Sequence, residues 1–257
     1  MDRVKFPASL QQLIFGGDSL FNQPIAGAIL PSTLRLLRLG GSFNHPIEAV
    51  VWPPSLQELV FEIHSCFIHP VEDVAWPPSL QQLTFGQIFD KPIARATFPA
   101  SLQQLSFGWY FNQPIEGVLW PDSLQRLGFG TDLNQPVDNV IWPSSLQELT
   151  FGCIDLSNDG FFVYSRFNQR IDRSAWPASL RRLTLGYNFK QSLQGLGTWM
   201  PNLETFRLLD CGRRHEQSIL RDIEWPKGLR HLSVFEGSTL VDGVVIPETV
   251  GVCRQPL

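Results

Sequence analysis

Apolar residues recur along the chain in a short pattern, Leu-x-x-Leu-x-Phe, that returns about every 22 residues. We take the first Leu of each copy as position zero, which places the second Leu at +3 and the Phe or Leu at +5. Position zero falls at Leu10, Leu34, Leu56, Leu80, Leu102, Leu124, Leu146, Leu180, Leu203 and Leu229. A fixed period of this length is the sequence signature of a solenoid, in which each repeat packs against its neighbours.

Within each copy the alternation of apolar and polar positions predicts a short strand with one buried face. Positions +3 and +5 are apolar, whereas +2 and +4 are mixed. An aromatic or aliphatic residue stands at −4, Trp120 for example, and we expect it in the core. A Gly follows at +6 in most copies, where a positive φ or a close approach to a neighbouring turn is easy. The Pro-containing return leg is expected to be extended, which leaves little room for helix.

The full unit, Pro-x-Ser-Leu-x-x-Leu-x-Phe-Gly-x-x-Phe-Asn-x-Pro-Ile, resembles the FNIP repeat, a 22-residue relative of the leucine-rich repeat. The resemblance covers Phe6 to about Pro247. It implies a leucine-rich-repeat-type right-handed β-solenoid of about ten repeats, with one parallel strand per repeat on a concave sheet and an irregular convex side. The Asn column is expected to bond the backbone of adjacent turns. Asp90 keeps an acceptor there, but Ile68 does not, and we expect local loosening at that copy.

The repeats predict one solenoid domain over residues 1–257, with degenerate copies from about 190 to 257. A fading eleventh copy follows Pro247 and has Val250 at position zero. The one long step between copies holds an insertion at 153–166, where a turn signal, Asn158-Asp159-Gly160, separates two apolar runs and predicts a small hairpin or ordered loop. This insertion either covers the solenoid or forms a contact site through Phe161, Phe162 and Tyr164.

The +2 and +4 positions of the strands are predicted to point onto the open face of the sheet. This face is either a solvent-compatible surface without a partner or a concave binding surface. The candidate binding residues are Glu58, Gln82, Gln104, Arg126, Glu148, Arg182, Arg207 and His231.

The formal net charge of −4 argues against general binding of nucleic acid. The charge is uneven: residues 1–152 carry 7 basic and 13 acidic side chains, and residues 153–257 carry 13 and 11. The arginines of the second half form either a solvated surface or a patch for an acidic partner.

No set of residues predicts catalysis or a cofactor. His64, Cys66 and His69 match no common zinc spacing, so a turn variant is favoured over a metal site. Cys211 and His215 are interpreted as part of a plain loop. The four cysteines form no terminal cluster, and there is no Asn-x-Ser/Thr acceptor, no signal peptide and no membrane span, so we expect a reduced, cytoplasmic monomer. The chain enters its first repeat within six residues, which also fits a fragment of a larger protein.

These features favour a non-enzymatic scaffold or adaptor that binds a protein through its concave face. A receptor fragment that recognises a peptide or glycan is the alternative. An enzyme is a remote third, and it would require a bound metal or a cluster of strongly shifted pKa values in a pocket.

Overall fold

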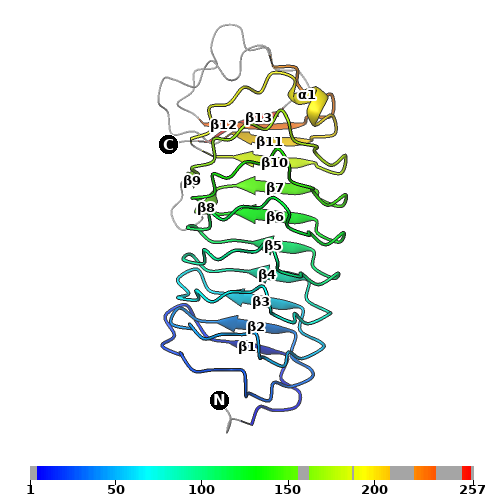
Figure 1. The fold of residues 1–257 in the computed structure, drawn as a ribbon. Helices are drawn as coiled ribbons and strands as arrows, with labels where there is room; N and C mark the ends of the chain where they lie inside the picture. Colours follow the sequence, from blue (N-terminus) through cyan, green and yellow to red (C-terminus); the bar gives the residue numbers. More distant parts are fainter. Residues whose placement is uncertain (1–4, 156–161, 187, 209–222, 236–250, 256–257) are drawn as a thin grey trace.

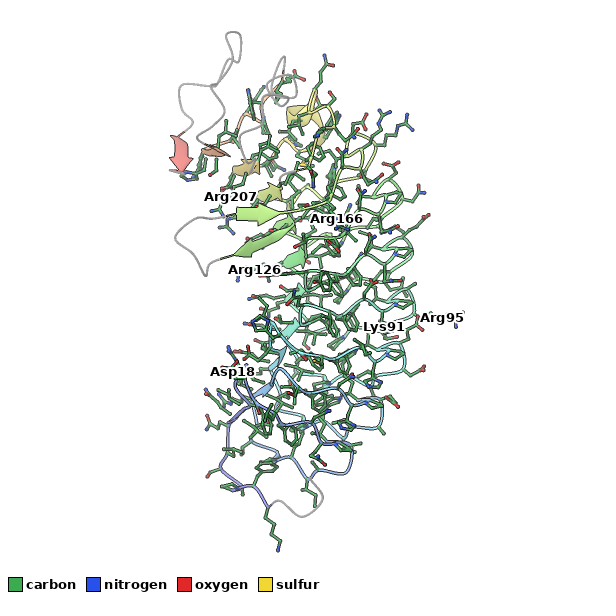
Figure 2. The ribbon with its side chains drawn as sticks, turned by 90° about the vertical axis from the view of Figure 1, so that its left-hand side faces the viewer. Asp18, Lys91, Arg95, Arg126, Arg166 and Arg207 are labelled. Atoms are coloured by element: carbon green, nitrogen blue, oxygen red, sulfur yellow. The ribbon has the colours of Figure 1, made fainter. Side chains whose placement is uncertain are left out.

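The computed structural model describes residues 5–155, 162–186, 188–208, 223–235 and 251–255. One parallel sheet of eleven strands runs through these residues, with the strands stacked in chain order except that β8 and β9 stand apart (Figure 1). Its strands are β1 Gln12–Ile14, β2 Leu36–Leu39, β3 Glu58–Phe61, β4 Gln82–Thr84, β5 Gln104–Ser106, β6 Arg126–Phe129, β7 Glu148–Phe151, β10 Arg182–Leu185, β11 Thr205–Leu208, β12 His231–Phe235 and β13 Gly251–Gln255. The sheet lies on the concave side of the stack (Figure 2).

The strand register follows the repeat numbering through ten strands. Each strand from β1 to β12 pairs with its neighbour so that one +2 residue faces the next, as Gln104 faces Arg126. The pairing of β7 with β10 keeps this register although 34 residues separate Glu148 from Arg182. The insertion therefore leaves the solenoid without shifting it. The leucine-rich-repeat-type β-solenoid and its irregular convex side are confirmed, with one short helix, α1 Leu196–Trp199, among the described residues.

The eleventh strand departs from the predicted numbering by one residue. The prediction placed position zero of that copy at Val250, three residues after Pro247, which would set Val252 at +2. In the structure Val252 pairs with Leu232, which is at +3. In this last, degenerate copy the distance from the proline therefore does not give the strand register.

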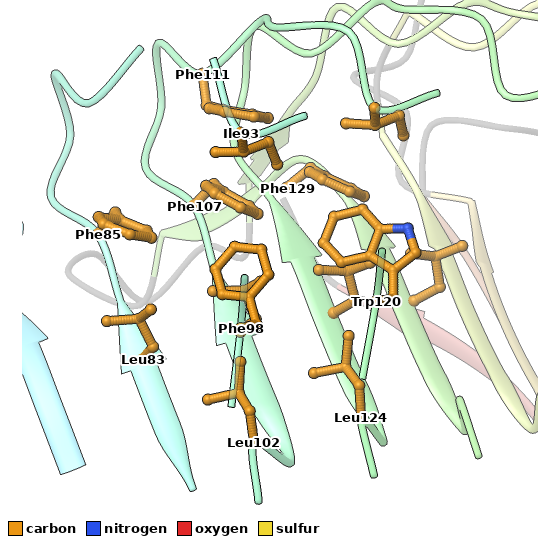
Figure 3. Close-up of a cluster of buried hydrophobic side chains, with 14 of the residues drawn as sticks. Leu83, Phe85, Ile93, Phe98, Leu102, Phe107, Phe111, Trp120, Leu124 and Phe129 are labelled. Carbon is orange, nitrogen blue, oxygen red and sulfur yellow. The ribbon is translucent and has the colours of Figure 1, made fainter. Parts of the chain in front are cut away.

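The core consists of columns of identical positions that repeat from turn to turn. From the second copy on, the Leu residues at zero and +3 are almost completely buried, as are the rings at +5 and in the Phe-Asn element, whereas Leu10, Leu13, Phe15 and Phe21 of the first copy are partly buried. Phe85, Phe107 and Phe129 stack with centroid separations of 5.5 and 5.6 Å, and Phe111 stacks on Phe107 at 4.1 Å (Figure 3). These offset contacts suit aromatic quadrupoles, so the spacing between turns also sets favourable ring geometry.

The aromatic residues at −4 line the same core beside the Leu columns. Trp120 is 8% exposed and stacks on Phe98 with centroids 6.2 Å apart (Figure 3). Its indole Nε1 is buried and has no hydrogen-bond partner among the described residues, and Trp52, Trp76 and Trp142 share this property. The predicted burial is therefore confirmed for the five central members of this column, from Trp52 to Trp142, whereas Phe6, Leu30, Trp176, Trp199 and Trp225 are partly buried.

A ladder of side-chain amides joins the turns beside the core, as the Asn column predicted. The Oδ1 atom of Asn112 accepts a hydrogen bond from the backbone N–H of Asn134 at 2.9 Å. The Asp90 carboxylate accepts from the N–H of Asn112 at the same distance. Ile68 has no side-chain acceptor to offer, so the ladder is interrupted between its turn and that of Asp90. Its own N–H is still bonded to Asn44 Oδ1, at 3.2 Å.

The Gly column at +6 marks a close approach of backbones rather than a special φ. A Cβ on Gly108 would lie 2.0 Å from the carbonyl oxygen of Gly86, and one on Gly130 would lie 1.8 Å from that of Gly108. Of the two alternatives in the sequence, close approach is therefore correct at these turns. Gly152 differs, because its φ of 124° requires glycine where the chain leaves for the insertion.

Candidate functional site

Seven of the eight candidate residues occupy the +2 row on the open face of the sheet, and Arg207 stands at +4. The predicted +2 residues lie on successive strands, and the parallel register sets each beside the next. All eight candidates are at least partly exposed: Glu58, Gln82, Gln104, Arg126, Glu148, Arg182, Arg207 and His231. Figure 2 shows Arg126 and Arg207 on the side of the strands and Lys91 and Arg95 on the opposite side. The structure thus brings the candidates together on one surface.

Three of these residues form a charged row across β6, β7 and β10. Glu148 Oε2 lies 3.7 Å from Arg126 Nε and 3.5 Å from Arg182 Nη1. The side chains of Arg126, Glu148 and Arg182 are 56%, 37% and 53% exposed. Half-exposed ion pairs contribute little stability, roughly 0–1 kcal/mol each. One carboxylate shared between two guanidinium groups leaves an uncompensated positive charge on the face.

More positive charge lies around this row. Arg207 is exposed on β11, next to Thr184 of β10 in the register. Arg181 pairs with Glu204 at 3.5 Å on the flank of the sheet, a contact that the +2 and +4 positions did not predict. Both residues stand at +1, so the same repeat numbering would have found this pair.

One position of the predicted open face is not open. Thr184, at +4 of β10, is 6% exposed, although its neighbours Thr150 and Arg207 are at least partly exposed. At the other end of the sheet, Arg38 of the +4 column pairs with Glu62 at 3.3 Å. The +4 column is therefore closed at Thr184, and the +2 row carries seven of the eight candidate residues.

The insertion contains the predicted hairpin. Strands β8 Cys153–Asp155 and β9 Phe162–Tyr164 pair antiparallel. Two of its three candidate contact residues, Phe162 and Tyr164, lie in β9, and Phe161 lies outside the described residues. The chain rejoins the solenoid at Arg166, whose N–H bonds the Thr131 carbonyl at 2.6 Å and whose side chain pairs with Asp132 at 3.3 Å.

In the part of the chain that the structure describes, no group of three or more His, Cys, Asp or Glu residues could hold a metal ion. His69 instead places Nε2 3.3 Å from the carbonyl oxygen of Asn44 in the ladder, and Cys66 is an exposed free thiol. Cys211 and His215 lie outside the described residues. The hydrogen bond from Arg170 lowers the pKa of Asp172.

No helix among the described residues is long and apolar enough to cross a membrane.

The comparisons with known proteins agree with this geometry. The FNIP Repeat family model matches residues 21–62, 69–110 and 111–153. A solved circular leucine-rich-repeat protein, CroV588, is 31% identical, covers 97% of this chain and superposes with a TM-score of 0.63. The chain spans 40% of the length of that protein. No curated protein matches the sequence.

Two bacterial structures have lower scores. An internalin, InlF, from Listeria monocytogenes is 12% identical, with 89% of this chain and 68% of that chain covered and a TM-score of 0.45. A leucine-rich repeat protein from Bacteroides ovatus is 12% identical, with 86% and 69% covered and a TM-score of 0.24. The family match agrees with the 22-residue unit of the sequence, and the similarity to CroV588 agrees with the observed solenoid. The chain is an FNIP-repeat protein with a leucine-rich-repeat-like solenoid fold.

Proposed function

We propose that the chain is a non-enzymatic scaffold that binds an acidic protein segment on its concave face. The observation that carries the proposal is the row of Arg126, Glu148 and Arg182, in which two guanidinium groups share one carboxylate. A carboxylate of the partner placed over these strands would accept hydrogen bonds from the guanidinium group of either arginine. Arg207 supplies a further exposed guanidinium on the same face.

The shape of the surface supports a protein or peptide partner. The face extends over eleven parallel strands and presents short polar side chains between the charged ones. Guanidinium groups recognise carboxylates through paired N–H donors, so such a row gives both charge complementarity and register along an extended segment. Complementary charges of this kind mainly raise the association rate and the specificity. The proposal places the protein, as a monomer, in a reducing compartment such as the cytoplasm, in keeping with the exposed thiol of Cys66.

The test is affinity capture from native lysate with a sign-inverted row. The variant Arg126→Glu/Glu148→Arg/Arg182→Glu keeps alternating charges that can still pair, so its fold should be retained while the surface charge is inverted. Arg95→Glu on the opposite side is the matched control, because it changes the net charge by the same amount (Figure 2).

We expect a specific partner to be captured by the wild type and by Arg95→Glu, and to be lost with the inverted row. A partner kept by all three proteins would contradict binding on the concave face and direct attention to the hairpin at 153–166. Failure of every form to capture a protein would contradict the scaffold proposal itself.

A further inference from the structure

The most exposed apolar side chains of the protein are not scattered. Nine large apolar residues are exposed in the described part of the chain, and four of the five most exposed share position −5, directly before the buried aromatic. They are Ile29, Val51, Leu119 and Ile141, with exposed fractions of 85%, 79%, 81% and 83%. The two intervening turns place the shorter Ala75 and Thr97 at −5, and both are exposed. We name these six residues the apolar stripe.

The packing of the repeat explains why the stripe is exposed. In the return leg, −6 and −4 point into the core, as shown by Val118 at 4% and Trp120 at 8% exposure. Because the leg is extended, the residue between them must point outward. The fold therefore dictates the direction of the −5 side chain but not its apolar character. A solvated position would suit Ser, Lys or Glu equally well, so apolar residues at four of six turns require another explanation.

An acidic column runs beside the stripe, three residues earlier in four of its six turns, whereas Ala26 and Ala94 hold this position in the other two. Glu48 precedes Val51 in this way, Glu116 precedes Leu119 and Asp138 precedes Ile141. These three carboxylates are exposed, and the equivalent Glu72 is partly exposed before Ala75. Three residues of chain reach at most about 11 Å, so each carboxylate lies within reach of a partner that covers the stripe.

We propose that the apolar stripe and its acidic column are a second docking surface, one that takes a basic amphipathic helix of a partner protein. The six turns of the stripe extend over about 24 Å at the usual strand spacing of about 4.8 Å. A helix rises about 5.4 Å per turn, so a helix lying along the stack offers one apolar residue to nearly every repeat over about 16 residues. Its flanking Lys and Arg residues would meet the carboxylates.

The pattern of sizes along the stripe fits the same occupant. The side chains of the stripe are larger at its two ends, at Ile29 with Val51 and at Leu119 with Ile141. They are smaller in the middle, at Ala75 and Thr97. A straight helix can place its largest apolar side chains over this lower centre. Helix-in-groove recognition uses the same i, i+3, i+4, i+7 spacing of apolar anchors. The acidic column disfavours an anionic lipid surface, which would be repelled by it.

The test uses a designed peptide as probe. A 21-residue helix with Leu on one face and Lys on the other is labelled, and its binding is measured by fluorescence anisotropy. A peptide with Glu in place of Lys is the charge control. Two double variants change the surface, Leu119→Ser/Ile141→Ser and Glu116→Lys/Asp138→Lys. Leu20→Ser is the matched protein control, because Leu20 is 88% exposed but lies outside the stripe.

We expect the Lys peptide to bind the wild type and Leu20→Ser equally, and to bind each double variant at least about tenfold more weakly, since each loses apolar contact or charge complementarity. The Glu peptide should not bind. Circular dichroism melts should show that the variants remain folded, because all four altered side chains are exposed. Equal binding to all proteins, or no binding at all, would overturn the proposal.

Two further measurements identify other occupants. Sedimentation velocity of the protein without peptide would show a dimer that Leu119→Ser/Ile141→Ser dissociates if a second copy covers the stripe. Cosedimentation with vesicles rich in phosphatidylserine would show binding through the stripe if it were a lipid surface. Either result would overturn the assignment to a partner helix. This surface is separate from the concave face, so failure here leaves the proposed scaffold function untouched.

Discussion

At the scale of single residues, the fold depends on close contacts and hydrogen bonds between neighbouring turns. The glycines at +6 allow one backbone to contact the next, and the Asn column supplies an acceptor for a backbone N–H one turn away. Both devices act only where an adjacent turn exists. The same residue type therefore has different energetic weight in the middle of the stack and at its first turn.

The Gly column gives the sharpest prediction at this scale. Gly108→Ala would force a Cβ to within 2.0 Å of the Gly86 carbonyl oxygen, so the turns must separate. We expect a loss of about 1–3 kcal/mol in the free energy of unfolding, or more, measured by urea denaturation. Gly16→Ala is the control at the same position of the first turn, where nothing lies within 4 Å of the added Cβ. It should be neutral or slightly stabilising. Equal losses in both variants would show that close approach is not the reason for the column.

The interrupted amide ladder predicts that one substitution lowers the stability of the protein and another raises it. Asn112→Ala removes the acceptor for the Asn134 N–H and for Gln135 Nε2, and should lower the free energy of unfolding by about 1 kcal/mol. Ile68→Asn should instead add an acceptor for the Asp90 N–H and raise the melting temperature slightly. Thermal melts that compare the two variants with the wild type test both expectations. A melting temperature lowered by Ile68→Asn would mean that the Ile side chain itself stabilises its turn.

At the scale of elements, each strand is stable only because its aromatic and Leu columns continue through the neighbouring turns. Repeat number, strand position and the outward columns could all be predicted from the sequence, because each 22-residue copy repeats the same alternation. The hairpin of the insertion could also be predicted, from its turn signal between apolar runs. The shift of β13 could not, because numbering from Pro247 places +3 at Cys253, whereas Val252, one residue earlier, pairs with Leu232.

The Trp column predicts a contrast between two substitutions at one position. Trp120→Ala removes a buried ring and should cost about 3–5 kcal/mol in unfolding free energy. Trp120→Phe should cost much less, since the indole Nε1 has no partner in the described structure and Phe98 occupies the same position one turn earlier. Chemical denaturation of both variants tests this. A large and equal loss in both would contradict this prediction and show that the site requires the full volume of the indole.

At the scale of the whole molecule, the solenoid presents two surfaces of different chemistry. The concave face carries an excess of arginine around β6 to β11, whereas the return legs carry exposed apolar residues with carboxylates three residues earlier in four turns. The uneven charge of the two halves of the sequence gave a hint of this division. The repeat numbering already sets Glu148 between Arg126 and Arg182 in the +2 column. The sequence could not give the contact of one carboxylate oxygen with both guanidinium groups, because that depends on side-chain conformation and on a register that spans the insertion.

Binding of an acidic partner to the concave face can be tested by measuring affinity with charges reversed in this protein and in its partner. The captured partner is titrated by calorimetry against the wild type, Arg126→Glu/Glu148→Arg/Arg182→Glu and Arg95→Glu. We predict binding at least about tenfold weaker for the inverted row alone, with recovery when the acidic residues of the partner are changed to Lys. Equal affinities for all three proteins, or no recovery with the Lys partner, would contradict the account.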